Sequence, residues 1–181
     1  MSFEQPERGC PSVHTGHDLQ WLIADRSHRH QLKTFTCTEP PGLLYDVHRG
    51  RHHPALWELQ VQSHIRDIRP PRPPDEALLL GLASGSIAAV SHFGFDRSGE
   101  QFIVWAVATD VAHRRRGHAS AILQRTLAVL AVNKSDQGLD CGVFTRIHRS
   151  NEASQALFAE VGFACLDDPA DGELQHWIAA L

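Results

Sequence analysis

The sequence has one tyrosine, two lysines and no long apolar run. Tyr45 is the only tyrosine among 181 residues, so a mechanism that needs a tyrosine as proton donor has one candidate. No apolar run approaches the ~18 residues of a membrane-spanning helix, and the polar segment 1–16 lacks the apolar stretch of a signal peptide. These absences predict a cytoplasmic protein with no membrane partner.

Cysteine is scarce as well. The four cysteines, at positions 10, 37, 141 and 165, form no C-x-x-C pair and no other spacing that is typical of a metal site. Histidine is frequent, with thirteen residues, but no pattern fixes ligand geometry or carboxylate support. We therefore expect reduced thiols, solvated loop histidines and no metal.

Neither sign of charge dominates. Seventeen basic and twenty-one acidic residues give a net charge of -4, which does not favour wholesale binding of nucleic acid. Fifteen of the basic residues are arginines, whose planar forks suit phosphate, so a local anion site stays open. The length and a hydrophobic content of 42% fit one globular domain over residues 1–181, as a monomer or a homodimer.

Strand-like and helix-like patterns follow one another along the chain. Residues 18–23 read as the start of a helix and 33–38 as a strand, and the proline-rich segment 70–74 as a loop within the domain. Helices are predicted over 54–68, 116–132 and 151–162, and strands over 77–83, 86–93, 101–109, 139–147, 163–166 and 174–180. This order predicts an α/β fold, a mixed sheet with helices on its faces.

The segment 107–119 runs from a strand through a short loop into a long helix. The first turn of a helix has N–H groups without partners and a partial positive charge, which together attract anions. Gly117 allows close approach of a ligand, and the arginines at 114–116 add charge. The loop lacks the G-K-S/T of a Walker motif and the G-x-G-x-x-G of a dinucleotide fold. The residues favour a pyrophosphate site, and a solvated arginine run ahead of a helix is the alternative.

Two motifs resemble those of the GCN5-related N-acetyltransferase (GNAT) family. Arg114-x-x-Gly117-x-Ala119 resembles the family's Q/R-x-x-G-x-G/A loop, and segment 151–163 resembles its second signature, an Asn, a Leu-Tyr pair and a closing Gly-Phe. The resemblance covers 75–166 clearly, as the acetyl-CoA-binding core. It implies a mixed, mostly antiparallel central sheet flanked by helices on both faces. Residues 1–50 match poorly, and this is where the family builds its acceptor site.

The resemblance implies transfer of an acetyl group from acetyl-CoA to a primary amine, by direct attack in a ternary complex. Backbone N–H groups of the loop would hold the pyrophosphate, the pantetheine arm would lie beside the preceding strand, and an N–H near Val107 would stabilise the oxyanion. The implied acetyl-CoA-binding residues are Val107, Ala108, Thr109, Arg114, Arg115, Arg116, Gly117, His118, Ala119, Ser120, Asn151 and Phe158.

The catalytic acid and base are not identified by the resemblance. Phe158 takes the place of the family's proton-donating tyrosine, and Tyr45 lies in the poorly matched region. The remaining candidates are Glu58, His148 and Ser154, with His92 and Glu100 predicted at strand ends. A catalytically weak or inactive module that binds acyl-CoA or a protein partner is therefore the alternative function.

Overall fold

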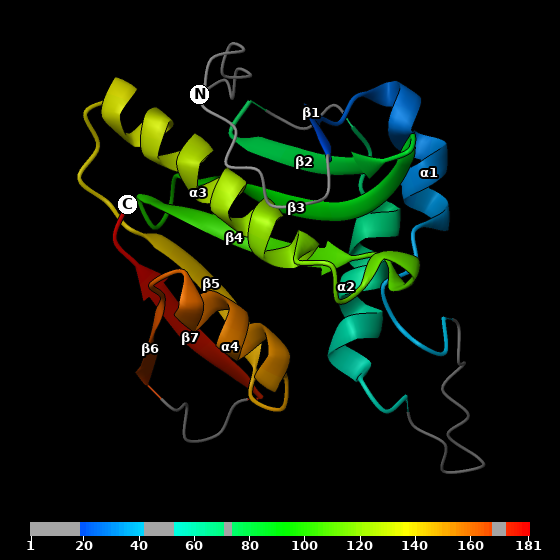
Figure 1. The fold of residues 1–181 in the computed structure, drawn as a ribbon. Coiled ribbons are helices and arrows are strands. Elements are labelled where there is room, and N and C mark those ends of the chain that lie inside the picture. The colour runs from blue at the N-terminus through cyan, green and yellow to red at the C-terminus, as the bar shows by residue number, and fades with distance from the viewer. Residues whose placement is uncertain (1–18, 42–52, 71–73, 168–172) are drawn as a thin grey trace.

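Seven strands form one twisted sheet in the computed structural model, which describes residues 19–41, 53–70, 74–167 and 173–181 (Figure 1). Tyr45, Cys10 and much of the predicted acceptor-side region lie outside these residues. The strands are β1 Gln20–Ile23, β2 Glu76–Ala83, β3 Ser86–Asp96, β4 Gln101–Thr109, β5 Val143–His148, β6 Ala164–Asp167 and β7 Leu174–Ala179. The helices are α1 Arg29–Thr34, α2 Leu56–Asp67, α3 His118–Asp136 and α4 Glu152–Glu160, with 3₁₀ turns η1 Arg26–His28 and η3 Val111–His113.

The strand order is β1-β2-β3-β4-β5-β7-β6, and every neighbouring pair is antiparallel except β4 and β5, which are parallel. Helices α1 and α2 cover one face of the sheet, and α3 and α4 cover the other (Figure 1). This confirms the predicted mixed, mostly antiparallel sheet with helices on both faces. None of the helices within the described residues is long and apolar enough to span a membrane.

The apolar run of β2 reflects burial on both of its faces. Leu78 and Leu80 pack in a cluster with Leu32 of α1 and Ile65 of α2, whereas Leu79 packs on the opposite face with α3 residues such as Leu123. A strand that is covered on both sides has no polar alternation, which explains why β2 reads as a continuous hydrophobic stretch. Two separate cores thus lie on either side of one sheet.

The hairpin predicted between β2 and β3 is confirmed. Ser84 and Gly85 are its central residues, with φ angles of 50° and 81°. Positive φ at both positions matches a type I′ turn, whose twist suits the flanking strands. The predicted strands and helices after residue 54 all form, with boundaries that shift by a few residues.

Two predictions at the N-terminal side are wrong. Residues 20–23 form the edge strand β1 rather than a helix, because they pair with β2 in antiparallel register. Residues 29–34 form helix α1, so the strand predicted over 33–38 is absent. The side chain of Asp25 accepts a hydrogen bond from Ser27 N at 2.8 Å at the start of η1, and Leu32 is fully buried. Tertiary packing thus overrides weak local preference here.

The apolar spacing predicts an inward face of Ala153, Ala156, Leu157 and Val161 on α4. On α2 it predicts an inward face of Trp57, Val61, Ile65 and Ile68, with Gln62 on the polar side. In α4, Ala153 and Ala156 are exposed and Phe158 is the buried residue. In α2, Gln62 lies on the expected polar side but is 1% exposed, because its amide bridges Cys37 N at 2.9 Å and Pro41 O at 2.8 Å. A buried amide with both ends hydrogen-bonded substitutes for an apolar residue at little cost.

The strands β4 and β5 separate part of the way along their length. The two strands pair at Phe102 with Val143 and at Ile103 with Phe144 and no further, although β4 continues to Thr109 and β5 to His148. Trp105 is a bulged residue, because the register with β3 jumps across it. A bulge bends a strand and re-aims its side chains. The separation of β4 from β5 leaves space at the centre of the sheet, and the site described next lies there.

Candidate functional site

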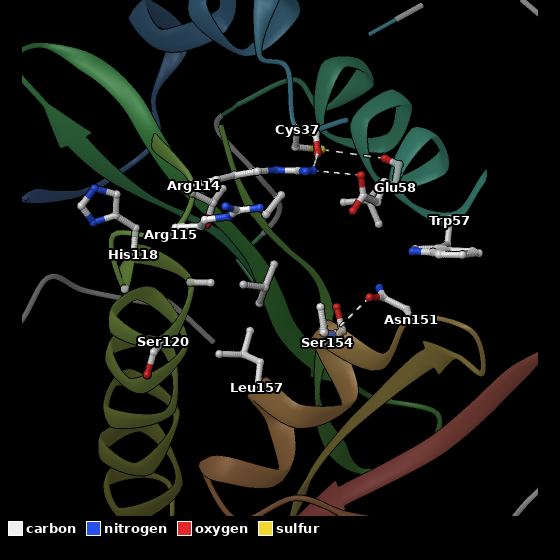
Figure 2. A pocket seen from close by; sticks show the side chains of 17 residues that line it. Cys37, Trp57, Glu58, Arg114, Arg115, His118, Ser120, Asn151, Ser154 and Leu157 are labelled. Carbon is white, nitrogen blue, oxygen red and sulfur yellow. Dashed lines mark hydrogen bonds and ion pairs between the residues drawn. The ribbon is translucent and has the colours of Figure 1, made fainter. Parts of the chain in front are cut away.

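A cavity of about 460 Å³, here called the loop cavity, lies where the end of β4 meets the start of α3. Helices α2 and α4 close its other sides (Figure 2). Its lining includes every residue predicted to bind acetyl-CoA except Arg116 and Phe158. The lining residues are Cys37, Trp57, Glu58, Val61, Val107, Ala108, Thr109, Arg114, Arg115, Gly117, His118, Ala119, Ser120, Asn151, Ala153, Ser154 and Leu157.

Arg116 and Phe158 lie outside this cavity. Arg116 is exposed. Phe158 is 4% exposed, and its ring packs edge-on against Phe163 with centroids 4.9 Å apart. The residue in the slot of the family tyrosine is therefore a core residue, and its side chain carries no hydroxyl.

The N-terminus of α3 faces the loop cavity. Gly117 precedes the helix with φ of 76°, a left-handed conformation that glycine adopts without a steric penalty. Apart from Gly117 itself and its two chain neighbours, no described residue has an atom within 4 Å of the position that a Cβ on Gly117 would occupy, so this side of the loop is open. The next residues, Ala119 and Ser120, line the cavity and belong to the first turn, whose N–H groups have no carbonyl partner within a helix. The arrangement can bind an anion.

Arg114 lines the loop cavity and also connects the loop to helix α2. Its Nη2 donates to Oε2 of Glu58 at 2.9 Å and to the carbonyl oxygen of Cys37 (Figure 2). Glu58, a candidate base, is therefore already an ion-pair partner. Glu58 balances part of the charge of Arg114. Arg115 also lines the cavity, and no such carboxylate partner is seen for it among the described residues.

The segment 35–38 joins α2 to the loop through backbone groups. Val111 N donates to Thr36 O at 2.9 Å, and Arg66 Nε donates to Phe35 O at 2.7 Å. Arg66 also donates to the Thr36 hydroxyl at 3.1 Å. These bonds fix α2 beside the loop and place Trp57 and Glu58 on the cavity wall.

Cys37 is a buried thiol on the wall of the loop cavity. Burial raises its pKa to about 12, and the nearby Glu58 carboxylate adds to the shift. The thiol Sγ donates to the carbonyl oxygen of Glu58 at 3.8 Å. A thiolate is the nucleophilic form of cysteine, so Cys37 is inert at neutral pH.

A second cavity, of about 600 Å³, opens beside the separated strands and is here called the strand cavity. Both cavities are lined by Trp57, Val61, Val107, Asn151 and Ser154, so they adjoin each other. The strand cavity is rich in aromatic and imidazole side chains, including Trp105, Phe144, His64, His148 and His176.

The other candidate catalytic residues are distributed over these walls. Ser154 lines both cavities, and its N donates to the Asn151 side chain at 3.1 Å, which confirms Asn151 as the N-cap of α4. His148 lines the strand cavity and stacks on Trp57 with ring centroids 4.6 Å apart. His92 is buried within β3 rather than at a strand end, and Glu100 lies in the turn before β4.

Among the cavity residues that sequence reasoning missed are Cys37, His64 and Trp105. Cys37 lies in a segment expected to be a strand, and Trp105 was expected only as a strand residue. His64 belongs to the predicted helix over 54–68 but was not among the candidate site residues. Trp105 lies at the bulge of β4, and a bulge leaves no clear signal in one sequence.

Many solved structures share the architecture of this chain. The GNAT domain of the S. lividans protein PAT has a TM-score of 0.61 at 17% identity, with 90% of each chain covered. The PaiA N-acetyltransferase from Thermoplasma acidophilum, in complex with coenzyme A, has a TM-score of 0.61 at 9% identity, covering 91% of this chain and 99% of that chain. The ribosomal-protein-S18-alanine N-acetyltransferase from Escherichia coli has a TM-score of 0.57 at 14% identity, covering 91% and 96%.

No protein-family model and no curated protein matches the sequence. The structural matches nevertheless agree on one architecture across nearly the whole chain. The chain therefore has the GNAT fold, as its two motifs predicted.

Proposed function

We propose that this protein is an acyltransferase that moves the acetyl group of acetyl-CoA to a primary amine, by direct attack in a ternary complex. The observation that carries the proposal is the separation of β4 from β5, with the open N-terminus of α3 at one end of the gap and two adjoining cavities along it. One cavity suits the thioester and the other suits the acceptor. The structural neighbours include named N-acetyltransferases, which supports the same chemistry.

The residues of the loop cavity fit acetyl-CoA. The first turn of α3 and Arg115 would hold the pyrophosphate, and the open face of Gly117 leaves room for phosphate oxygens. The pantetheine arm would lie along Val107, Ala108 and Thr109, where β4 has left β5 and an extended ligand can bond to the strand. Residues 75–166 would thus form the acetyl-CoA-binding core, with acetyl-CoA supplying the activated acetyl group.

The protein would promote the transfer mainly by positioning. A backbone N–H near Val107 would stabilise the oxyanion that forms when the amine attacks the thioester carbonyl. Holding both reactants in adjoining cavities converts a bimolecular step into an effectively unimolecular one. Cys37, the thiol on the wall of the loop cavity, stays protonated, which supports direct attack over an acyl-enzyme.

The test is release of free thiol from acetyl-CoA in the presence of a panel of acceptors. The panel contains a peptide with an N-terminal alanine, a lysine peptide, spermidine and an aminoglycoside. We expect turnover with at least one amine and thermal stabilisation by acetyl-CoA alone. Thermal stabilisation without turnover on any acceptor supports the alternative, a module that binds acyl-CoA without catalysis. The observation that favours this alternative is Phe158, a buried side chain with no hydroxyl to protonate the thiolate.

The buried thiol gives a further prediction about the route. Iodoacetamide at pH 8 should alkylate the exposed Cys165 readily and Cys37 at least roughly 100-fold more slowly, because little Cys37 thiolate exists at that pH. Mass spectrometry of tryptic peptides measures both rates. Unfolding the protein in guanidinium should make the two rates equal. Rapid labelling of Cys37 in the folded protein, or acetylation of Cys37 by acetyl-CoA alone, would contradict direct attack.

A further inference from the structure

Three ionisable side chains form a hydrogen-bonded chain with one end at the strand cavity. His64 on α2 lines this cavity. Its Nε2 lies 2.9 Å from Nδ1 of His92 on β3, and Nε2 of His92 lies 3.0 Å from Oε2 of Glu76 on β2. Three elements that are separate in the sequence thus meet in one continuous path, Glu76–His92–His64.

We propose that the hydrogen-bonded path Glu76–His92–His64 supplies the general base of the acetyl transfer. His64 takes the proton of the acceptor amine, and His92 and Glu76 position its ring and stabilise the charge that it gains. The inference rests on the proposed function, since it assigns a step of that reaction. A positioned base of this kind contributes about 10²–10⁴ to the rate of such a step.

The bonding pattern orients the protons. An ionised Glu76 only accepts hydrogen bonds, so His92 donates from Nε2 and carries its lone pair on Nδ1. His64 then donates from Nε2 to that lone pair, so Nδ1 is the nitrogen that gains a proton when the neutral ring becomes an imidazolium. A carboxylate behind a histidine raises its basicity in the same manner at metal and hydrolase sites.

Burial protects the middle of the chain. His92 is 4% exposed, and the Trp105 ring packs on it with centroids 4.7 Å apart. The two ends differ, because His64 is exposed at the cavity and the Glu76 side chain is 25% exposed. A proton can therefore enter at His64 and leave to solvent at Glu76 without passing through open water in between.

The proton balance of the reaction requires such an acceptor. An ammonium ion and a thioester give an amide, a thiol and one released proton. The nitrogen adds to the thioester carbonyl, the oxyanion collapses and the C–S bond breaks, and the leaving thiolate takes one of the two protons that the nitrogen gives up. His64 takes another from the attacking nitrogen, and shifts along the two hydrogen bonds pass the charge toward Glu76.

The bases predicted from the sequence are placed less well. Glu58 is held by Arg114, and His148 accepts from Ser150 N through Nδ1 at 3.1 Å while its ring stacks on Trp57. Other charged or ionisable groups lie around His64, His92 and Glu76. They are Asp96, Arg146, His148 and His176 on the cavity wall, Asp67 one turn along α2, and Asp75, which is paired with Arg97 beside Glu76.

The experiment compares His64→Gln and Glu76→Gln with the wild type, using acetyl-CoA and the best amine of the panel. We expect His64→Gln to lower kcat by roughly 100-fold or more while the Kd for acetyl-CoA, measured by calorimetry, is unchanged. Glu76→Gln should move the acidic limb of the kcat/KM profile to lower pH, because the imidazolium loses its carboxylate partner. Matched controls are His30→Gln on α1 and Glu160→Gln on α4, both exposed and outside the two cavities.

The outcomes separate the two proposals. If the wild type releases no thiol with any amine, the proposed function fails, and the proposed role of His64, His92 and Glu76 fails with it. If the wild type turns over and His64→Gln keeps its kcat, the general base is elsewhere and only this inference is overturned. A Glu76→Gln variant that melts lower but keeps the wild-type pH profile shows a structural role alone, which also overturns it.

Discussion

Gly117→Glu is expected to abolish measurable binding of acetyl-CoA while the protein stays folded. The new carboxylate would extend from an open point of the loop, where nothing within 4 Å obstructs a Cβ. It would compete for the N–H groups of the first turn of α3 and repel the pyrophosphate. Two charges 4 Å apart near a protein surface repel by about 4 kcal/mol, so a loss of affinity beyond roughly 100-fold is expected. Isothermal titration calorimetry with acetyl-CoA measures it.

The fold should survive this change because two effects on stability oppose each other. Holding a non-glycine residue at φ of 76° costs about 1–2 kcal/mol. A negative charge at the start of α3 returns part of that through the helix dipole. Gly117→Ala is the matched control, because it carries the same backbone strain without the charge. Affinity that falls equally in both variants would show that loop conformation decides binding, and unchanged affinity in Gly117→Glu would reject the anion site.

The parts of the site that lie close together in the sequence were predictable. The loop, Gly117 and the first turn of α3 come from one stretch of chain, so the pattern strand–loop–helix specifies their geometry directly. The cap at Asn151 is likewise local, because its side chain bonds a backbone N–H three residues later. The β2–β3 hairpin follows from two turn residues. In each case the interaction that fixes the structure joins neighbours in the sequence.

The unpredicted parts depend on contacts between distant segments. Arg114 meets Glu58 across 56 positions, and His92 meets His64 across 28. The spacing of residues within one helix or strand says nothing about such pairs. Residues 20–23 became a strand for the same reason, since pairing with β2 outweighed their own preference. The side of the site that would hold acetyl-CoA is thus largely local in origin, whereas the side that would act on the amine is assembled by the tertiary fold.

Gly94→Ala is expected to destabilise the protein by about 2–3 kcal/mol, the upper part of the range for overpacked positions. Gly94 lies on β3 at a point where the strand passes close to Asp75 and Trp105. A Cβ there would clash with the backbone oxygen of Asp75 and would meet two ring atoms of Trp105 at 2.9 Å. A backbone oxygen cannot rotate away, so the start of β2 must shift together with the bond from Phe95 N to Asp75 O. The melting temperature should fall by roughly 4–12 °C.

Gly99→Ala is the control for that measurement. Gly99 lies in the following turn, and a Cβ there meets only the ends of side chains, the nearest being Asp96 Oδ2 at 3.0 Å. Those atoms can move aside, so its melting temperature should stay near that of the wild type. Displacement of Trp105 in Gly94→Ala would disturb the strand cavity and leave the loop cavity intact, because Trp105 lines only the former. The variant should therefore melt early yet still be stabilised by acetyl-CoA. Equal melting temperatures for the two variants would mean that the contact between Gly94, Asp75 and Trp105 is not close-packed in solution.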